Sequence, residues 1–549
     1  MRVHAIIVLA GCLAGALDAG PATQDEAIWQ EARRNGRLVD DIFGRTRRMM
    51  HAWLSHADKE TLLLPDRLPG LIRGKPNTES IYTPHNSGAD LYPYLVITAF
   101  FTDPAVYHGR MREMLRDEVR YTNANGHIPG NFDFKTKQLG PPSFFGAGEY
   151  AKDGLLSVTE LLGRTPWFYR MVDMLEDFRQ RAPVNTKFGR LPATGAELNG
   201  DVLQALARVI PMTGDARALE WAEQIGDAYI EEILPRNSYL PGYEYDFQTR
   251  TDAGRTRLRD HGNETIVGLI LLAAIENDWQ RPRAGSYTPV LERMLDRVLA
   301  SANTDGLLYN QIRNSDLRPL DEKLADNWGY VYGAMYAFYQ FTGKEKYREA
   351  VRRVLRNLLR YRSYDWESGG MDGYADSIEG AIYLLAREPV AEAREWVESE
   401  MQTLLAYQQP DGTIERWYGD GNWNRTTLLY AMMKTQGCYL RDWQPGVELG
   451  AVQQNGKLFV SVSSAQPWKG RVVFDAPRHR LAMNLRRNYA RLNEWPEWWT
   501  AEPSALYRVD DPDGGTERLV LGSELSEGII CDVASGKAAR RIVSLARPR

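Results

Sequence analysis

The chain has 549 residues, which is too long for one ordinary hydrophobic core and predicts at least two domains. Charged residues make up 25% and hydrophobic residues 43%, proportions typical of soluble globular proteins. The formal net charge of −5, with no long basic run, argues against nucleic acid as the main partner, because phosphate binding needs a basic surface.

The N-terminus has the pattern of an export signal. A short polar start precedes residues 5–17, which are apolar apart from glycines and Cys12. This stretch is too short to span a membrane and has the length of a signal-peptide core, so we predict a signal peptide over residues 1–22. Alternatively, residues 9–12 resemble a lipobox, which would leave Cys12 as a lipid-anchored first residue. We expect an exported protein: periplasmic, an outer-membrane lipoprotein, or secreted.

Cysteine is scarce in this chain. Beyond Cys12 there are only Cys438 and Cys531, which could pair but do not form a disulfide framework. They also cannot supply a cluster for zinc or iron–sulfur. We therefore expect no cofactor and assign no metal ligands, while calcium binding stays open.

Residues 23–445 alternate between two kinds of helix. One kind is amphipathic, as in residues 344–360, where apolar residues recur at helical spacing with Lys, Arg and Glu between them. The other kind is apolar nearly all round and must be buried, so the charged helices should surround the apolar ones. The apolar helices are predicted at residues 90–101, 153–162, 201–210, 265–275, 328–341, 378–386 and 426–433.

The turns between these helices repeat as well. Pairs such as Gly214-Asp215 and Gly343-Lys344 follow an apolar helix and precede an amphipathic one, and glycine is a common helix terminator. A second, glycine-led loop recurs every 40 to 65 residues or so, a period that indicates a repeat architecture. The chain is thus predicted to be mainly α, an (α/α)6 toroid of helical hairpins. A seventh hairpin would form if the helix around residues 26–57 pairs with the one starting at Asp90.

The pattern changes after Gly446. Residues 457–462 and 470–474 have the composition and alternation of β-strands, and later short segments continue it. Residues 443–446 read as a linker. We predict that residues 446–549 form a β-sandwich domain packed on the toroid.

Each apolar helix begins with a polar cluster. If these helices are parallel, the clusters meet at one rim, where helix N-termini also favour anionic groups. Asp and Asn are common helix caps, so a single member of the set is more simply explained as a cap, and only the recurrence points to a site. The clusters are residues 86–90, Glu149 with Asp153, Glu197 with Asn199 and Asp201, residues 260–264, residues 326–328, residues 372–379 and residues 422–425.

Some of these side chains exceed what capping needs. His261 and Glu264 share one helix face, although a histidine with satisfied hydrogen bonds in the core is an alternative explanation for His261. Asp376 and Glu379 have the same spacing inside an otherwise apolar helix, where an acid is costly. Flat rings that could stack on sugars lie in the rim loops: Trp328, Trp366, Trp417 and Trp423.

The helix-pair repeat, the glycine-led loops and the β-domain together resemble the six-hairpin glycosidase superfamily over roughly residues 80–545. This superfamily includes unsaturated glucuronyl hydrolases and bacterial arabinofuranosidases. The most family-like string is Asp372-Gly373-Tyr374-Ala375-Asp376-Ser377-Ile378-Glu379-Gly380, and residues 468–475 and 491–498 are similar to the β-domain of the arabinofuranosidase branch. That branch includes enzymes with a cysteine nucleophile beside a cysteine-bound zinc. The chain lacks those cysteines, so that mechanism does not carry over.

We predict a glycoside hydrolase acting on a carbohydrate chain, with uronic-acid-containing chains among the candidate substrates. Glycosidic cleavage usually takes two carboxyl groups, and we assign Asp376 or Glu379 to one role and Glu264 or Asp326 to the other, with His261 tuning a carboxylate. Arginine could bind a sugar carboxylate bidentately. The candidate substrate contacts are Asp90, Asn199, Asp201, Arg259, Asn263, Trp328, Tyr374, Trp423 and Arg425.

Two alternatives remain open at this point. The first is a polysaccharide lyase on a similar toroid, with His261 and Tyr374 as base and acid and with Asn263 or Arg425 neutralising a uronate. The second is a carbohydrate-binding surface protein without catalytic activity.

Overall fold

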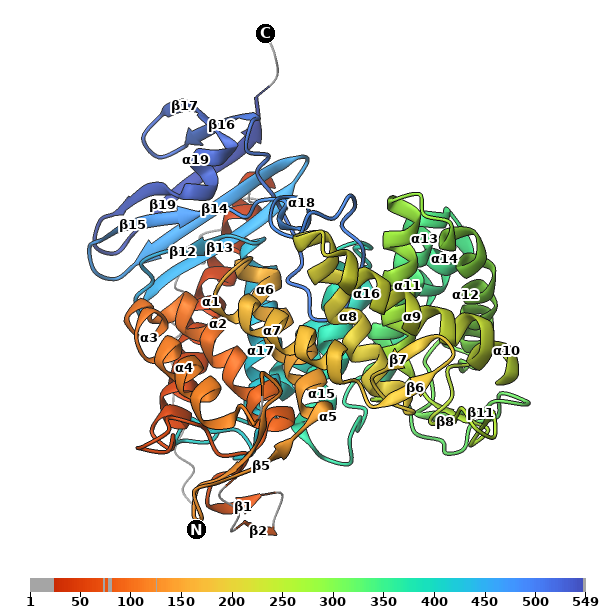
Figure 1. Cartoon of the computed structure of the whole chain (residues 1–549). Coiled ribbons are helices and arrows are strands. Elements are labelled where there is room, and N and C mark those ends of the chain that lie inside the picture. The colour runs from red at the N-terminus through yellow and green to blue at the C-terminus, as the bar shows by residue number, and fades with distance from the viewer. Residues whose placement is uncertain (1–23, 73–74, 78–80, 125, 547–549) are drawn as a thin grey trace, which may run out of the picture.

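The computed structural model describes residues 24–72, 75–77, 81–124 and 126–546 (Figure 1). The predicted signal peptide and its Cys12 alternative lie outside the described residues. Among the described residues, no helix combines the length and apolarity that a membrane crossing needs.

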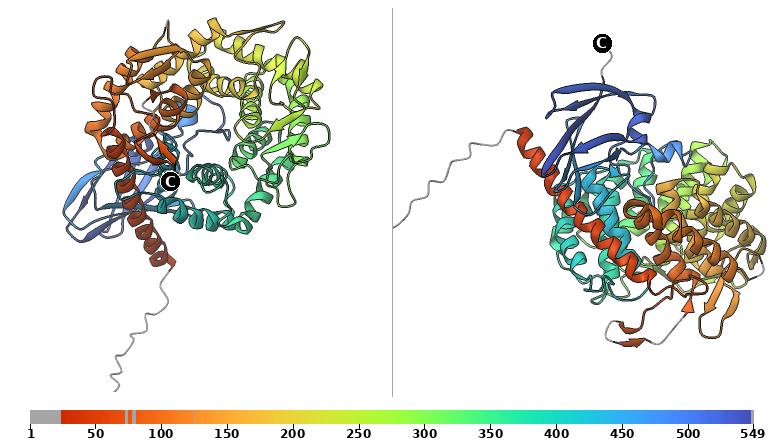
Figure 2. Two further views of the ribbon diagram at one scale, coloured as in Figure 1. Left: turned by 90° about the horizontal axis from the view of Figure 1, so that it is seen from below. Right: turned by 90° about the vertical axis from the view of Figure 1, so that its left-hand side faces the viewer.

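Two concentric layers of helices form a closed ring (Figure 2). The inner helices pack on one another around the ring, with the step from α6 to α8 made by the π-helical turn before α6 (Tyr150–Leu155), and the last, α17, packs on the first, α2. The inner helices of the described chain are α2 (Tyr92–Thr102), α6 (Leu156–Leu162), α8 (Ala196–Thr213), α11 (Gly262–Asp278), α13 (Trp328–Thr342), α15 (Met371–Leu385) and α17 (Asp420–Thr435). The outer helices are α1 (Gln24–Leu54), α4 (Arg110–Thr122), α7 (Pro166–Arg181), α9 (Ala216–Ala228), α12 (Arg283–Ala300), α14 (Glu345–Asn357) and α16 (Ala391–Ala406). The predicted toroid is confirmed, and the hairpin of α1 and α2 is its seventh.

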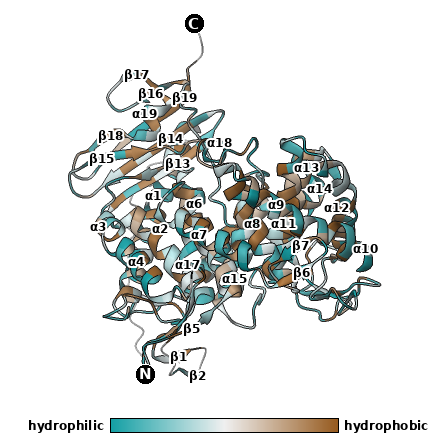
Figure 3. Ribbon diagram, viewed as in Figure 1, coloured by the Kyte–Doolittle hydropathy of each residue, from teal (hydrophilic) through white to brown (hydrophobic). Residues whose placement is uncertain are grey.

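Composition explains why each helix takes its layer. Nearly every residue of α13 is buried, whereas α14 buries one face through Tyr347, Val351 and Val354 and presents its basic residues outward. Figure 3 shows this division as brown apolar turns along α8 and teal polar residues on the outer turns of the ring. The ring therefore has one continuous apolar core between its two layers.

Glycines let neighbouring inner helices cross closely near the site. A Cβ on Gly200 of α8 would lie 2.3 Å from the backbone carbonyl carbon of Glu264 in α11. A Cβ on Gly329 of α13 would lie 2.4 Å from the Cα of Gly380 in α15. Because no larger residue fits these crossings, the inner helices are drawn together around the ring's axis.

The C-terminal part is built from two antiparallel sheets. The larger has the strand order β13-β14-β19-β16-β17, and the smaller has the order β12-β15-β18. Their strands are β12 (Tyr439–Leu440), β13 (Val447–Gln454), β14 (Lys457–Ser464), β15 (Trp468–Val473), β16 (Leu506–Asp511), β17 (Thr516–Leu521), β18 (Ile529–Val533) and β19 (Lys537–Leu545). The larger sheet packs on helix α1 through β13 and β14. Cys438 and Cys531 are both buried and free, so they do not form the disulfide that the sequence left open.

One long segment leaves these sheets. Residues 474–505, here called the insertion segment, connect β15 to β16 and contain only the short helix α18 (Arg478–Leu481). In the left view of Figure 2, which is seen from below, a blue loop of the C-terminal part lies inside the ring of helices. The C-terminal part therefore both covers the toroid and reaches into it.

Candidate active site

A cavity of about 220 Å³ lies at the end of the ring where the inner helices begin. Every inner helix of the described chain, or the turn just before it, contributes to its wall. The lining residues are His85, Asn86, Asp90, Phe145, Glu149, Lys152, Asp153, Glu197, Asp260, Glu264, Asn327, Tyr330, Asp372, Asp376, Tyr418, Asn422 and Arg425. Polar residues that are far apart in the sequence thus meet in one place, because the inner helices all start at the same end.

Two wall segments are π-helical turns that precede inner helices. Pro84–Leu91 leads into α2 and carries Asp90, and Tyr150–Leu155 leads into α6 and carries Lys152 and Asp153. A π-turn inserts an extra residue into the helical ladder and is frequent at functional sites. Here both turns carry charged residues that line the cavity, Asp90 in the first and Lys152 and Asp153 in the second.

Arg425 anchors one side of the cavity. Its Nη2 lies 2.7 Å from Asp376 Oδ1 and 2.6 Å from Glu379 Oε2. Burial raises the pKa of Asp376, and the Arg425 guanidinium opposes that rise. Glu379 is wholly buried, accepts a hydrogen bond from Tyr330 at 2.8 Å and another from Tyr383, and burial raises its pKa to about 7. Glu379 therefore holds Arg425 from beneath, while Asp376 faces the cavity.

Lys152 anchors the other side. Its Nζ lies 2.8 Å from Asp153 Oδ2, 3.2 Å from Glu264 Oε1 and 3.7 Å from Asp201 Oδ1. Burial raises the pKa of Glu264 to about 8 despite Lys152. Burial also acts to raise the pKa of Asp153, but the Lys152 charge and hydrogen bonds outweigh it and hold that pKa below its usual value. One lysine thus sits between an acid that keeps its proton at neutral pH and an acid that loses it.

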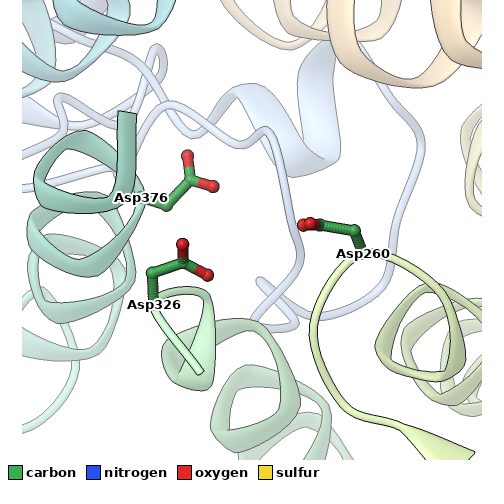
Figure 4. A group of neighbouring side chains, drawn as sticks. All are labelled: Asp260, Asp326 and Asp376. Atoms are coloured by element: carbon green, nitrogen blue, oxygen red, sulfur yellow. The ribbon is translucent and has the colours of Figure 1, made fainter. Parts of the chain in front are cut away.

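Three aspartates form a smaller group at the edge of the cavity. Carboxylate oxygens of Asp260, Asp326 and Asp376 lie within 4.8 Å of one another, and Figure 4 shows them pointing toward a shared space. Asp326 is wholly buried, and its Oδ2 lies 2.9 Å from Nε of Arg259. That guanidinium also pairs with Glu367 at 3.0 Å. Because Arg259 already neutralises Asp326, we assign no metal to this group.

Four of the residues predicted from sequence line the cavity: Asp90, Glu264, Asp376 and Arg425. Burial, with the nearby charges of Asp153 and Asp372, raises the pKa of Asp90 well above its usual value. The catalytic and substrate-binding roles of these four residues stay predictions.

The roles predicted for three other acids are corrected, because these residues are buried away from the cavity. Glu379, Asp326 and Asp201 have no exposed surface and do not line the cavity. Each lies instead beside a cationic side chain, Glu379 at Arg425, Asp326 at Arg259 and Asp201 at Lys152. They support the charged side chains around the cavity and cannot touch a substrate in this arrangement.

The predicted aromatic contacts are also corrected. Trp328 and Trp423 are wholly buried, with their indole N–H groups donating to Ser377 Oγ at 2.9 Å and to the Leu404 carbonyl at 2.7 Å. Tyr374 packs near Tyr407, away from the cavity. These rings fill the space between the inner and outer layers, which is the ordinary use of a large ring in a helical core.

The two predicted asparagines shape loops. Asn199 donates to the carbonyl groups of Ala193 and Gly195 and so closes the turn before α8. Asn263 accepts a hydrogen bond from the backbone N–H of His261 at 2.8 Å. Both are buried, and neither lines the cavity.

His261 and Arg259 lie just behind the wall. His261 is paired through Nδ1 with Glu197, and its Nε2 lies 2.7 Å from Arg257 Nη1. Burial, with the Arg257 charge, lowers the pKa of His261 to about 4, so the ring is neutral at physiological pH. Arg259 is fully engaged by carboxylates, as described above. Neither residue is placed to contact a substrate in the cavity.

Sequence reasoning missed several wall residues. Lys152 carries the most weight, and its signal was a basic residue inside an otherwise apolar stretch, where a buried partner is required. Phe145 is 41% exposed and offers a flat apolar face at the cavity. From sequence, the role of stacking on a sugar is assigned to tryptophans instead. Asp372 was part of the family-like string and was given no role, although it lines the wall and is bonded by Asn422 at 2.8 Å.

Comparison with known proteins gives matches in shape only. No protein-family model and no curated protein matches the chain. Among solved structures, cellobiose 2-epimerase from Bacillus thermoamylovorans B4167 is 12% identical, with 60% of this chain and 90% of that chain covered and a TM-score of 0.40. Unsaturated glucuronyl hydrolase from Bacillus sp. GL1 is 13% identical, with 52% and 86% covered and a TM-score of 0.38. An α-1,6-mannanase from Salegentibacter sp. HEL1_6 is 12% identical, with 58% and 96% covered and a TM-score of 0.40.

These matches include an unsaturated glucuronyl hydrolase, one of the proteins that the sequence resembles. At such identities and TM-scores they carry no argument about chemistry. What this chain defines by itself is a closed toroid of helical hairpins with one carboxyl-lined cavity at the start of its inner helices.

Proposed function

We propose that the chain is a glycoside hydrolase in which Glu264 is the proton donor and Asp376 is the base or nucleophile. The observation that carries this proposal is a cavity that both carboxyl groups line, one beside Lys152 and the other beside Arg425. Of the four acids considered from sequence, these are the two that line it.

The chemistry of glycosidic cleavage needs such an unequal pair. One carboxyl group must be protonated to donate to the leaving oxygen, and the other must be ionised to activate water or attack the sugar. Glu264, with a pKa of about 8, carries its proton at neutral pH. Asp376 is paired with Arg425 at 2.7 Å, which favours its charged form and opposes the rise of its pKa that burial causes. Pairs of acids with separated pKa values are the recurring signature of this kind of catalysis.

The charge of the cavity favours a neutral or amino sugar over a uronic acid. In the part of the chain that the structure describes, its wall carries the side chains of eight acids and two strong cations, Lys152 and Arg425. Both cations are already paired with carboxylates. A uronate would enter without a free partner and would face Asp153 and Asp376, whereas hydroxyl groups can bond to both carboxyl and carboxylate groups. The exposed ring of Phe145 would stack on one face of a sugar.

The lyase alternative loses its residues in this arrangement. His261 is neutral but is held behind the wall by Glu197, and Tyr374 does not reach the cavity. The non-catalytic alternative keeps the cavity but gives no reason for two acids held beside different cations, Glu264 at Lys152 and Asp376 at Arg425. Hydrolysis therefore fits the geometry best.

The test is a panel of neutral, amino and uronic oligosaccharides incubated in ¹⁸O-labelled water, with product masses measured. A hydrolase inserts one labelled oxygen per cleavage, whereas a lyase inserts none and produces an ultraviolet-absorbing end. With a cleaved glycan in hand, Glu264→Gln and Asp376→Asn are expected to lower kcat about 100- to 10,000-fold. The matched control is Glu392→Gln on the exposed surface of α16, which should leave kcat unchanged. Wild-type kcat in both cavity variants would contradict the proposal.

We also propose that the protein is exported, on the strength of the apolar N-terminal pattern alone. Mass spectrometry of the mature N-terminus distinguishes a lipid-modified Cys12 from cleavage near residue 22. An intact Met1 in protein from the native cell envelope would contradict both.

A further inference from the structure

The insertion segment runs into the toroid from the end opposite the cavity. Asn484 donates to the carbonyl of Pro211 at the end of α8, at 3.0 Å. Tyr489 donates to Asp278 at the end of α11, at 2.8 Å. Arg387, just after α15, donates to Glu494 at 2.5 Å. The segment therefore rests on the C-terminal ends of the inner helices and closes that end of the ring.

A buried ionic network fixes the segment within the ring. Glu160, at the end of α6, accepts hydrogen bonds from Arg208 of α8 at 2.9 Å and from Arg491 of the segment at 2.7 and 2.9 Å. All three side chains are at most 1% exposed. Arg208 also donates to the carbonyl of Leu492 at 2.7 Å. Arg208 and Arg491 thus form a clamp on the Glu160 carboxylate. Because this clamp holds Arg491 and Leu492, it also fixes the position of Asn493, which follows them in the chain.

Asn493 is the point at which the segment meets the cavity wall. Its Nδ2 donates to the backbone carbonyl of Lys152 at 2.9 Å and to Asp153 Oδ1 at 3.1 Å. Both contacts are acceptors, so the amide has one orientation that satisfies them. Asn493 is wholly buried and has a left-handed backbone, with φ of 60°, a conformation that asparagine and glycine tolerate best.

The contacts of Asn493 affect Asp153, the carboxylate that pairs with Lys152. The Asn493 hydrogen bond is one of the interactions that hold the pKa of Asp153 below its usual value against burial. Asp153 in turn is the nearest carboxylate to Lys152 Nζ, which also contacts Glu264. A change at Asn493 would therefore reach the proposed proton donor through Asp153 and Lys152.

We propose that Asn493 is a positioning residue of the active site, and that the C-terminal part of the chain belongs to the catalytic machinery because its insertion segment holds Asp153 and Lys152 in place. This rests on the proposed function for its assay. A C-terminal part that only covered the toroid would need no buried contact with the residues that line the cavity.

The test compares variants at Asn493 with the same variants at Asn484. Asn484 is in the same segment, has a similar left-handed backbone with φ of 56°, and donates to the carbonyl of Pro211, which does not line the cavity. Asn493→Gly keeps the backbone and removes the amide, and Asn493→Asp replaces the donor by a charge facing Asp153. Both are expected to lower kcat by about 10- to 100-fold, the value of a hydrogen bond to a charged group, and to shift a limb of the pH–rate profile. Asn484→Gly and Asn484→Asp should leave both unchanged.

The possible failures are distinguishable. If the wild type cleaves no glycan, the proposed function fails, and the positioning role fails with it because there is no reaction for Asn493 to support. If the wild type cleaves but Asn493→Gly keeps the wild-type kcat and pH profile, the positioning role is wrong. A purely structural role is indicated if Asn493→Gly lowers the melting temperature while kcat and the pH limbs of the folded enzyme stay in place.

Discussion

The clamp on Glu160 gives the sharpest stability prediction. Glu160→Gln keeps the shape of the side chain but removes the carboxylate that Arg208 and Arg491 share, which leaves Arg491 only its longer pairing with Glu494 at 3.5 Å. Burial alone would raise the pKa of Glu160, yet the two arginines hold it at about 2 against an ordinary value of 4.5. That difference corresponds to about 3 kcal/mol of stability at neutral pH, in line with the roughly 3–5 kcal/mol lost when one partner of a buried ion pair is removed.

The same pKa fixes how the loss depends on pH. A carboxyl group whose pKa is lowered by folding stabilises the folded state above its unfolded pKa, and the contribution disappears as pH falls through the folded pKa. The difference in unfolding free energy between wild type and Glu160→Gln should thus be full at pH 7 and shrink between pH 4.5 and about 2. Urea unfolding followed by tryptophan fluorescence measures it.

The control is Glu400→Gln, another buried glutamate. It accepts hydrogen bonds from the Ser363 N–H at 3.2 Å, and burial raises its pKa, so its replacement by a neutral amide should cost under about 1 kcal/mol. Equal losses in the two variants, or a loss in Glu160→Gln that is undiminished at low pH, would refute the reasoning.

Four further predictions concern the cavity and its surroundings. The kcat of a cleaved substrate should fall as pH rises through about 8, where Glu264 loses its proton, and Glu264→Gln should abolish that limb of the pH–rate profile. Arg425→Met should lower kcat/KM at least about 100-fold, since Asp376 and Glu379 lose their shared counter-charge, and circular dichroism should check that the variant folds. His261→Asn should leave the pH–rate profile above pH 5 unchanged, because the His261 ring is already neutral there. If the variant loses the limb at high pH, His261 takes part in the reaction after all. Trp423→Phe should lower the unfolding free energy by about 1–3 kcal/mol with kcat/KM unchanged, whereas a specific rise in KM would restore a stacking role.

The sequence by itself determined the ring. Helices apolar on all sides, such as that of α13, have only one stable place, beneath amphipathic partners such as α14, and glycine turns such as Gly343 mark where one follows the other. Local composition fixes this arrangement because burial acts on each helix separately. The common direction of the inner helices then follows from the repeat, which is why acids hundreds of residues apart could be placed at one rim.

Only the tertiary structure decided which of the acids line the cavity and which are buried behind it. Asp376 and Glu379 lie on the same helix three residues apart, yet Asp376 enters the cavity and Glu379 lies beneath it against Tyr330 and Tyr383. That choice depends on the rotation of α15 and on the side chains its neighbours supply. The contact of Asn493 with Asp153 spans 340 residues and has no local signal at all. Spacing along a helix fixes which residues are neighbours, whereas the packing of other elements around the helix fixes which of them meets solvent, substrate or a buried charge.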